Sequence, residues 1–401
     1  EEPDGELAAI GEWALTTATG DRTDLSFFPS DETWSRVCSE ADACLGLRCH
    51  RREGCFVLRA RREASAAVVL VANHHLLFAD LAFRMAGAGF EDPGVLPPFR
   101  RVIFDEAHNV EKAATSFFSR SFNRFSLMRY LNRLHRRRKG KVVGLVPMLA
   151  RISGHPLKGV PGLIGDVREA AENLDARCSA LMGEGGSFLL EPGTRDRFLA
   201  EAGEALADLS ARIRELIESF TAAIDTVQED GREESANLAW ECRVQLNRLS
   251  EAAGVADQFR AAEAAGNEVY WMEALRGGRG EGTVRAATAA AREPARSAVR
   301  LVITPLAIGP LMREAVYEPL PTVVFTSATL TVADSFGYWA GRIGLDARSG
   351  REVSTGVFPS PFDYRSNVLI GVPTDAPAPD APGYRPFLGA FLGEALAASR
   401  G

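Results

Sequence analysis

The sequence predicts an α/β protein with parallel strands at its centre and a long helical insertion. Two apolar runs of strand length end in polar turns: residues 102–104 precede Asp105 and Glu106, and residues 323–325 precede Thr326. Buried parallel strands form such unbroken apolar runs, and their carboxyl ends hold the chemistry of α/β proteins. The stretch between the two runs is too long for a loop, so we expect an inserted domain there.

Composition limits the class of protein. At 401 residues the chain exceeds one typical domain, and a hydrophobic share of 46% is enough to build buried cores. Six cysteines, three of them closely grouped, favour metal binding in a reducing, cytoplasmic compartment over disulfides. No secretory signal and no bilayer-length apolar run occur, so no membrane partner is expected. The net charge of −7 argues only weakly against nucleic acid, because binding follows local patches.

Residues 1–66 are expected to form a mostly helical module that carries cysteines. Cys44, Cys49 and Cys55 are separated by four and five residues, with Cys38 just upstream. Zinc sites usually need two closely spaced pairs, and no second pair follows. Three thiolates at longer gaps can instead hold three corners of an iron–sulfur cluster, which commonly takes four. The alternative is a set of inert, buried cysteines.

Basic residues gather in two segments. The first holds six candidate nucleic-acid contacts: Arg48, Arg51, Arg52, Arg59, Arg61 and Arg62. The second runs from Arg133 to Lys141 and contains no acid. Either segment could follow a phosphate backbone, and either could be a solvated charged face. The aromatic residues that could stack on bases, each also suited to a core, are Phe56, Phe117, Phe118 and Tyr130.

Residues 67–72 form a continuous apolar run of strand length, followed by Asn73, His74 and His75. We expect a buried parallel strand here. The two histidines fit capping and packing as well as a role in nucleotide turnover. Pro97 and Pro98 then introduce the next expected strand.

Asp105, Glu106 and His108 are the candidate catalytic residues. Asp105 suits Mg²⁺, which prefers carboxylate oxygen and keeps most of its water. Glu106 could orient and deprotonate the water that attacks a γ-phosphate, and His108 could sense that phosphate. The bland alternative is a surface turn with this sequence. The small residues Ser327, Ala328 and Thr329, at the end of the other strand, could couple this loop to a second ligand.

The region 112–285 has a helical pattern. Leu206, Leu209, Ile213, Ile217, Phe220, Ile224 and Val227 recur at steps of three and four. This spacing predicts an amphipathic helix, with residues 235–265 as its antiparallel partner. Cys178 and Cys242 fit packing positions, and the glycine-rich residues 277–282 suit a linker. The runs at 301–303 and 323–325 would then complete the α/β domain that carries Asp105 and Glu106.

Taken together, these motifs resemble the DinG branch of the XPD-like iron–sulfur helicases of superfamily 2. The order is cysteine cluster, residues 68–77, Asp-Glu-Ala-His box and Ser-Ala-Thr turn. Smaller matches occur at Trp34, at residues 44–46, 55–56, 60–61 and 78–80, and later at residues 304–306 and 360–364. The resemblance implies a RecA-like ATPase motor that moves 5′ to 3′ on single-stranded DNA, with a [4Fe–4S] cluster in a wedge domain and a helical arch.

The resemblance also implies domain boundaries. Residues 1–66 would be the iron–sulfur module, 67–111 and 286–335 the two parts of the first motor domain, 112–285 the arch, and 336–401 the start of the second motor domain. No G-x-x-x-x-G-K-[ST] phosphate loop occurs, and the family's late arginine motifs are absent. We therefore expect this segment alone not to hydrolyse ATP. The fourth cluster ligand would be an upstream cysteine, or else Cys38.

The expected function is that of a monomeric, cytoplasmic, ATP- and Mg²⁺-dependent DNA helicase. It would act on single-stranded and forked DNA in repair or in removing unusual DNA structures. The alternative is a non-motor iron–sulfur protein that binds nucleic acid or senses redox state. An upstream nuclease domain, as in some relatives, stays open.

Overall fold

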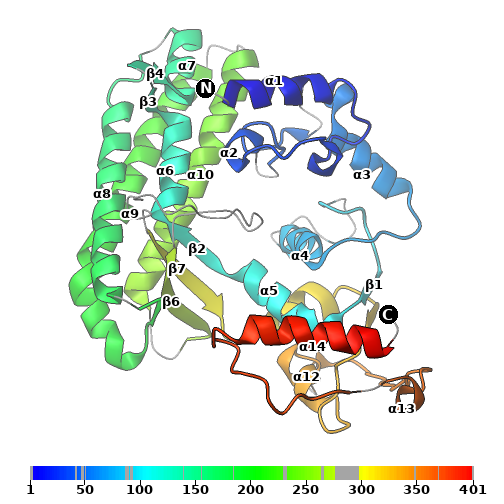
Figure 1. The fold of residues 1–401 in the computed structure, drawn as a ribbon. Coiled ribbons are helices and arrows are strands. Elements are labelled where there is room, and N and C mark those ends of the chain that lie inside the picture. The colour runs from blue at the N-terminus through cyan, green and yellow to red at the C-terminus, as the bar shows by residue number, and fades with distance from the viewer. Residues whose placement is uncertain are drawn as a thin grey trace. The chain divides into compact units, whose positions relative to one another are not determined.

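The computed structural model shows a mixed helix and sheet protein, which confirms the α/β class (Figure 1). It describes residues 3–40, 43–46, 49, 51–85, 90, 94–138, 140–154, 156–183, 185–228, 233–262, 266–275, 298–346, 349–368 and 370–399. The chain divides into two compact units, Glu1–Arg351 and Glu352–Gly401. Among the described residues, no helix is long and apolar enough to cross a membrane.

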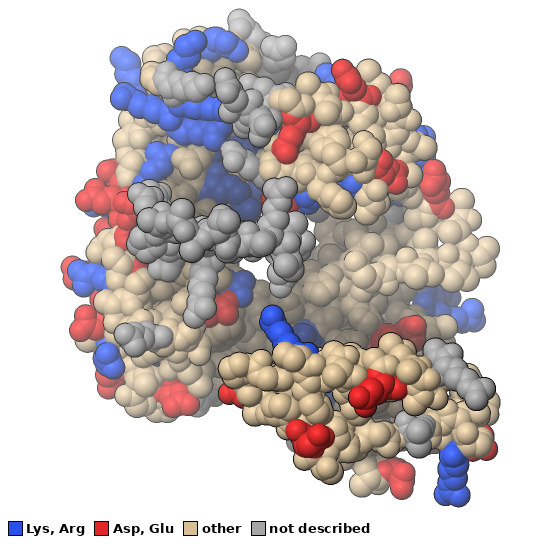
Figure 2. All heavy atoms as spheres, in the orientation of Figure 1, with Lys and Arg blue, Asp and Glu red and all other residues tan. Residues whose placement is uncertain are grey.

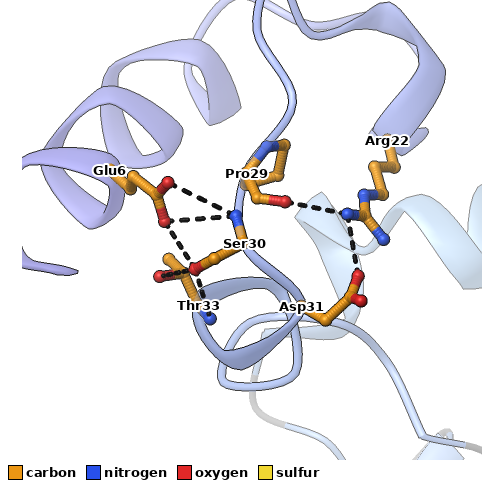
Figure 3. A network of polar contacts seen from close by, with 6 residues as sticks. All are labelled: Glu6, Arg22, Pro29, Ser30, Asp31 and Thr33. Carbon is orange, nitrogen blue, oxygen red and sulfur yellow. Dashed lines mark hydrogen bonds and ion pairs between the residues drawn. The ribbon is translucent and has the colours of Figure 1, made fainter. Parts of the chain in front are cut away.

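The cysteine module, residues 1–66, is helical as expected. Its helices and helical turns are α1 (Pro3–Ala14), η1 (Arg22–Asp24), α2 (Asp31–Trp34), η3 (Arg52–Gly54) and α3 (Phe56–Ala66). Polar contacts join α1 to the start of α2 (Figure 3). Ser30 caps α2 and donates its hydroxyl to Glu6 at 2.8 Å, while Arg22 bonds the Pro29 carbonyl and pairs with Asp31 at 3.0 Å. Hydrogen bonds from Thr33 and Ser30 lower the pKa of Glu6.

The expected strand at residues 67–72 is wrong. These residues form no strand, and Val68, Val69 and Val71 are largely exposed. An apolar run becomes a strand only where a neighbouring strand supplies backbone hydrogen bonds. Within the described part of the chain no strand pairs with this run.

A parallel-strand core follows. It is built from α4 (His74–Phe83), β1 (Arg101–Phe104), η5 (Ala107–Asn109), α5 (Val110–Phe118), α11 (Gly309–Met312), the π-helical turn η6 (Arg313–Tyr317), β8 (Thr322–Phe325) and α12 (Gly337–Arg342). Strands β1 and β8 pair in parallel, with Phe104 opposite Phe325, as the sequence predicted. Phe78, Phe104, Val316 and Tyr317 are buried at its centre. Gly309 and Gly344 approach so closely that a Cβ on Gly344 would lie 2.6 Å from the Gly309 Cα.

A buried ion pair fixes the loop that leads into β1. Asp80 of α4 pairs with Arg84, the C-cap residue of that helix, at 2.6 Å, and both side chains are almost fully buried. Arg84 also donates to the carbonyls of Phe90 and Leu96, and Asp80 accepts the Leu96 amide at 2.8 Å. Such a pair is retained only where hydrogen bonds satisfy both charges, as they do here.

The helical body contains the long helices expected in the middle of the chain. They are α6 (Arg124–Leu134), α7 (Leu145–Ser153), α8 (Val160–Met182), α9 (Pro192–Gln228) and α10 (Glu233–Ala261). The predicted stripe on α9 is confirmed, since Leu206, Leu209, Ile213, Phe220, Ile224 and Val227 are all fully buried, and Ile217 is partly buried against the same core. Helix α10 packs against α9 after a short connection, as the antiparallel partner expected. Cys178 and Cys242 are buried in this core, which confirms their packing role.

Two sheets belong to the helical body. The larger is four-stranded and antiparallel, in the order β2 (Arg120–Asn123), β7 (Ala298–Pro305), β6 (Glu268–Leu275), β5 (Ser187–Leu189). The smaller is the hairpin of β3 (Arg136–Arg138) and β4 (Lys141–Val143). Residues 301–303 were expected to help complete the first motor domain, and that boundary stays a prediction. They lie in β7, because Leu301 and Ile303 are buried against the helices of the body.

The second unit, Glu352–Gly401, contains α13 (Tyr364–Asn367) and α14 (Tyr384–Ser399). Asp363 caps α13 by accepting the Arg365 amide, and hydrogen bonding to Ser366 lowers the pKa of Asp363. No described residue of α14 is buried. The domain boundaries expected from the sequence stay predictions.

Candidate functional site

The two acidic residues and the Ser-Ala-Thr turn lie at one edge of the parallel pair. Asp105 and Glu106 follow β1, and Thr326 follows β8 in the same direction. The Thr326 amide donates to the Phe104 carbonyl at 2.9 Å, and the Ala107 amide donates to the Thr326 carbonyl at 3.0 Å. The two turns are therefore joined through their backbones, and the predicted pairing of the two motifs is found in the structure.

Three side chains of these turns meet. The His108 Nδ1 lies 2.7 Å from the Ser327 hydroxyl and 3.2 Å from the Glu106 carboxylate, and Ser327 also reaches Glu106 at 3.5 Å. Glu106 adopts a left-handed backbone (φ 47°, ψ 47°), which is rare for a residue with a side chain. Such outliers gather at functional sites, where the surrounding structure enforces them.

Aromatic rings pack against one another at the ends of the two strands, next to these turns. Phe104 stacks on Phe325 with ring centres 4.9 Å apart, and His74 stacks on Phe104 at 6.0 Å. His75 is exposed, and Asn73 rather than either histidine caps α4 by accepting the Leu76 amide. The packing alternative for His74 is therefore supported, whereas capping by the histidines is not.

Asp105 and Glu106 are both exposed at this edge, open to a ligand. Among the described residues no three His, Cys, Asp or Glu side chains are arranged to hold a metal ion. Mg²⁺ at a nucleotide site commonly takes only one or two carboxylates, with phosphate oxygens and waters as its other ligands. The carboxylate of Asp105 fits that requirement. Thr329 and Ala328 are also exposed, and the Thr329 amide donates to the Ser327 hydroxyl at 3.4 Å.

The cysteines of the module are free thiols. Cys38, Cys44, Cys49 and Cys55 are each partly buried and form no disulfide. Their soft donor chemistry fits an iron–sulfur cluster. Their arrangement in the described residues does not form a ready-made site for a metal ion. Cluster binding therefore stays a prediction.

Three of the predicted arginines line one pocket, which we call the α3 pocket. It has a volume of about 500 Å³ and lies between α3 and the loop at residues 94–97, with Arg52, Arg61 and Arg62 in its wall. Arg51 is exposed, and Arg59 bonds the Ala18 carbonyl and lies over the Phe56 ring. Arg48 lies outside the described residues.

The second basic segment forms an exposed hairpin. All three arginines of β3 are exposed, as is Lys141 on β4. Figure 2 shows Lys and Arg side chains gathered over this end of the helical body. Burial and the nearby Arg168 and Arg137 lower the pKa of His135, which favours the neutral form of its ring. The hairpin therefore presents exposed cations, which suits contact with nucleic-acid phosphates whatever the base sequence.

Sequence reasoning missed one pocket, which we call the Trp271 pocket. Its volume is about 570 Å³, and it lies between α5 and the antiparallel sheet. It shares His108 with the acidic turn and contains Trp271, Arg300 and Thr304 from β6 and β7. The alternation of side chains along β6 and β7 could have indicated it, had those strands been assigned to an antiparallel sheet.

Comparison with curated proteins finds helicases whose sequences align with almost the whole of this chain. The ATP-dependent DNA helicase YoaA of Escherichia coli is 26% identical over 405 residues, covering 99% of this chain and 53% of that protein. The ATP-dependent helicase DinG of Mycobacterium tuberculosis is 27% identical over 383 residues, covering 94% and 48%. The expected resemblance to the DinG helicases is confirmed.

One relative has the name of a nuclease rather than of a helicase. A protein named 3′-5′ exonuclease DinG from Bacillus subtilis is 21% identical over 383 residues, covering 90% of this chain and 38% of its own length. No family model matches the chain. The chain spans about half the length of the helicases it matches.

Proposed function

We propose that the full-length protein is an ATP-dependent DNA helicase and that this chain carries part of its motor. The contact of Glu106, His108 and Ser327 at the shared edge of β1 and β8 carries the proposal. A carboxylate linked in this way to a second strand end can transmit the state of a bound phosphate. The similarity to helicases along the chain supports the same reading.

Each residue of the acidic turn has a proposed role. Asp105 would hold Mg²⁺, which neutralises phosphate charge when it is bound. Glu106 would orient the attacking water and accept its proton, a role that needs an exposed carboxylate at the strand end. His108 and Ser327 would report the state of the site to the β8 turn, with Ala328 and Thr329 forming the rest of that turn.

DNA contact is proposed for two basic surfaces. The α3 pocket brings Arg52, Arg61 and Arg62 together; in the sequence Arg51 precedes Arg52, and Arg59 lies between Arg52 and Arg61. The basic hairpin β3–β4 offers a second cationic surface. Single-stranded DNA is bound largely through such electrostatic contacts.

Finer features are proposed from the family resemblance alone. They are 5′ to 3′ movement, a [4Fe–4S] wedge held by Cys44, Cys49, Cys55 and a fourth cysteine, an arch formed by the helical body, and a monomeric state. Action on forked DNA in repair, within the cytoplasm, belongs to the same group.

The test is ATP turnover by the full-length protein, purified without oxygen, with and without single-stranded DNA. We expect DNA to stimulate turnover and Glu106→Gln to lower it by about 10²- to 10⁴-fold, the usual contribution of a general base. Glu218→Gln, on an exposed face of α9, is the matched control and should turn over like the unaltered protein.

Two outcomes would count against the proposal. Absence of turnover in a protein with an intact cluster would favour the non-motor binding or sensing alternative. Unchanged ATP turnover in the Glu106→Gln variant would show that Glu106 is not the general base. End-labelled DNA, followed in the same reaction, would show whether the strand is unwound or digested.

A further inference from the structure

The antiparallel sheet of the helical body has two faces with different characters. Side chains alternate along a strand, so neighbouring residues face opposite ways. Phe122, Met272, Leu301 and Ile303 are buried in the helical core. The residues between them face the other way, and those that line the Trp271 pocket are Ser121, Trp271, Arg300, Val302 and Thr304.

Strand register puts three of these side chains in one row. Val302 of β7 lies opposite Ser121 of β2 on one side and opposite Trp271 of β6 on the other. Trp271 is partly buried, and its indole N–H donates to the Thr304 hydroxyl at 3.1 Å. This hydrogen bond fixes the ring against the sheet. The Trp271 pocket therefore holds an oriented aromatic side chain.

The facing wall of the pocket is α5. It contributes hydroxyls from Thr115 and Ser116, together with the ammonium of Lys112. Ser119, the C-cap of α5, also lines the pocket, and its hydroxyl donates to the Thr115 carbonyl at 2.6 Å. Ser119 lies 3.2 Å from the Thr304 hydroxyl, which joins the two walls. Hydroxyls and a cation around an aromatic ring are the groups that bind a nucleic-acid strand, with phosphates on the polar groups and a base on the ring.

The charge in the pocket favours an anion. Glu111, the acid among the lining residues, is paired with Arg342, and Arg300 is paired with Glu273 of β6, which does not line the pocket. Lys112 is exposed, and in the described part of the chain no carboxylate pairs with it. A pocket of about 570 Å³ has room for a base and its phosphates rather than for a duplex.

We propose that the Trp271 pocket binds single-stranded DNA, with one base stacked on the indole and its phosphates on Lys112 and the α5 hydroxyls. The proposal rests on the helicase function proposed above. The pocket shares His108 with the acidic turn, and His108 contacts Ser327 and Glu106 on its Nδ1 side. A strand seated in the pocket would thus touch the residue that links the two turns.

The experiment is a titration of a fluorescein-labelled oligo-dT with the full-length protein, without ATP. Trp271→Leu should weaken binding about 5- to 100-fold, the range expected when one stacked base is lost. Trp271→Phe keeps an aromatic face and should retain most of the affinity. Phe125→Leu removes a partly exposed ring from α6, outside the pocket, and should bind like the unaltered protein.

A cross-link in the unaltered protein avoids dependence on the folding of any variant. Oligo-dT carrying 5-iodouracil should form, under ultraviolet light, a cross-link that maps to the peptide containing Trp271. Loss of that cross-link on addition of dTMP, which cannot serve as the motor's triphosphate, would instead assign the pocket to a mononucleotide and overturn the proposal.

The remaining outcomes separate the pocket from the helicase function. If Trp271→Leu binds DNA like the unaltered protein while Glu106→Gln still abolishes DNA-stimulated turnover, the pocket proposal fails and the helicase stands. If the unaltered protein neither binds DNA nor hydrolyses ATP, both fail.

Discussion

At the scale of single residues, Glu106 has an unfavourable left-handed backbone conformation, which places its carboxylate beside His108 and Ser327. A left-handed conformation costs a non-glycine residue about 1–2 kcal/mol. The contacts of its neighbours enforce that conformation, because Ala107 and Thr326 are bonded across the two strands. The result is a carboxylate that points along the shared edge toward His108 and Ser327. The sequence predicted these three residues as a site, but the left-handed backbone of Glu106 is visible only in the structure.

The six cysteines differ in burial, and this difference predicts their reactivity. Burial raises the pKa of the Cys178 and Cys242 thiols to about 12. At pH 8 about one molecule in ten thousand would carry a thiolate at either position, and the thiolate is the reactive form. Cys38, Cys44, Cys49 and Cys55 are only partly buried.

We therefore predict that iodoacetamide at pH 8 alkylates the four cysteines of the module in metal-free protein but not Cys178 or Cys242. Mass spectrometry of tryptic peptides measures this, and urea should expose the two protected thiols. Protein purified without oxygen should show protection of Cys44, Cys49 and Cys55 if they hold a cluster. Equal labelling of all six cysteines in folded protein would contradict the assigned burial.

At the scale of elements, the sequence predicts an element well when the residues of that element alone define it, and poorly when its neighbours do. The stripe on α9 is a property of one helix, and it was predicted correctly. Residues 67–72 and 301–303 have the apolar character of buried parallel strands, yet neither lies in a parallel sheet. Pairing partners decide a strand's place, and a single sequence does not contain them. The pairing of β1 with β8 was predictable because both strands end in recognisable motifs.

The position of β1 depends on the buried pair of α4. We predict that Arg84→Met lowers the free energy of unfolding by about 3–5 kcal/mol, because Asp80 is left charged and buried without its partner. Urea denaturation followed by circular dichroism measures this. Arg342→Met removes an exposed ion pair with Glu111 and should change stability by less than about 1 kcal/mol. Equal effects of the two substitutions would show that the Asp80 site is open to water.

At the scale of the whole molecule, the first unit contains two separate hydrophobic cores. One fills the helical body and includes Phe220 and Leu249. The other lies around β1 and β8 and includes Phe104 and Met312. Residues packed in different cores share few contacts, so their stabilities need not be coupled. The acidic turn and α5 belong to the second core, and the Trp271 pocket lies between α5 and the sheet of the first core.

This arrangement predicts that the two cores unfold separately. Phe220→Ala should lower the stability of the helical body by about 3–5 kcal/mol, and Met312→Ala that of the parallel-strand core by about 2–5 kcal/mol. Hydrogen exchange at increasing urea, followed peptide by peptide, measures both regions in one sample. Each substitution should speed exchange only in its own region, because a cavity weakens the packing around it. If either substitution speeds exchange equally in α9 and in β1, the two cores form one cooperative unit. In that case a strand bound at the Trp271 pocket could alter the acidic turn through the whole fold, and coupling would not depend on His108 alone.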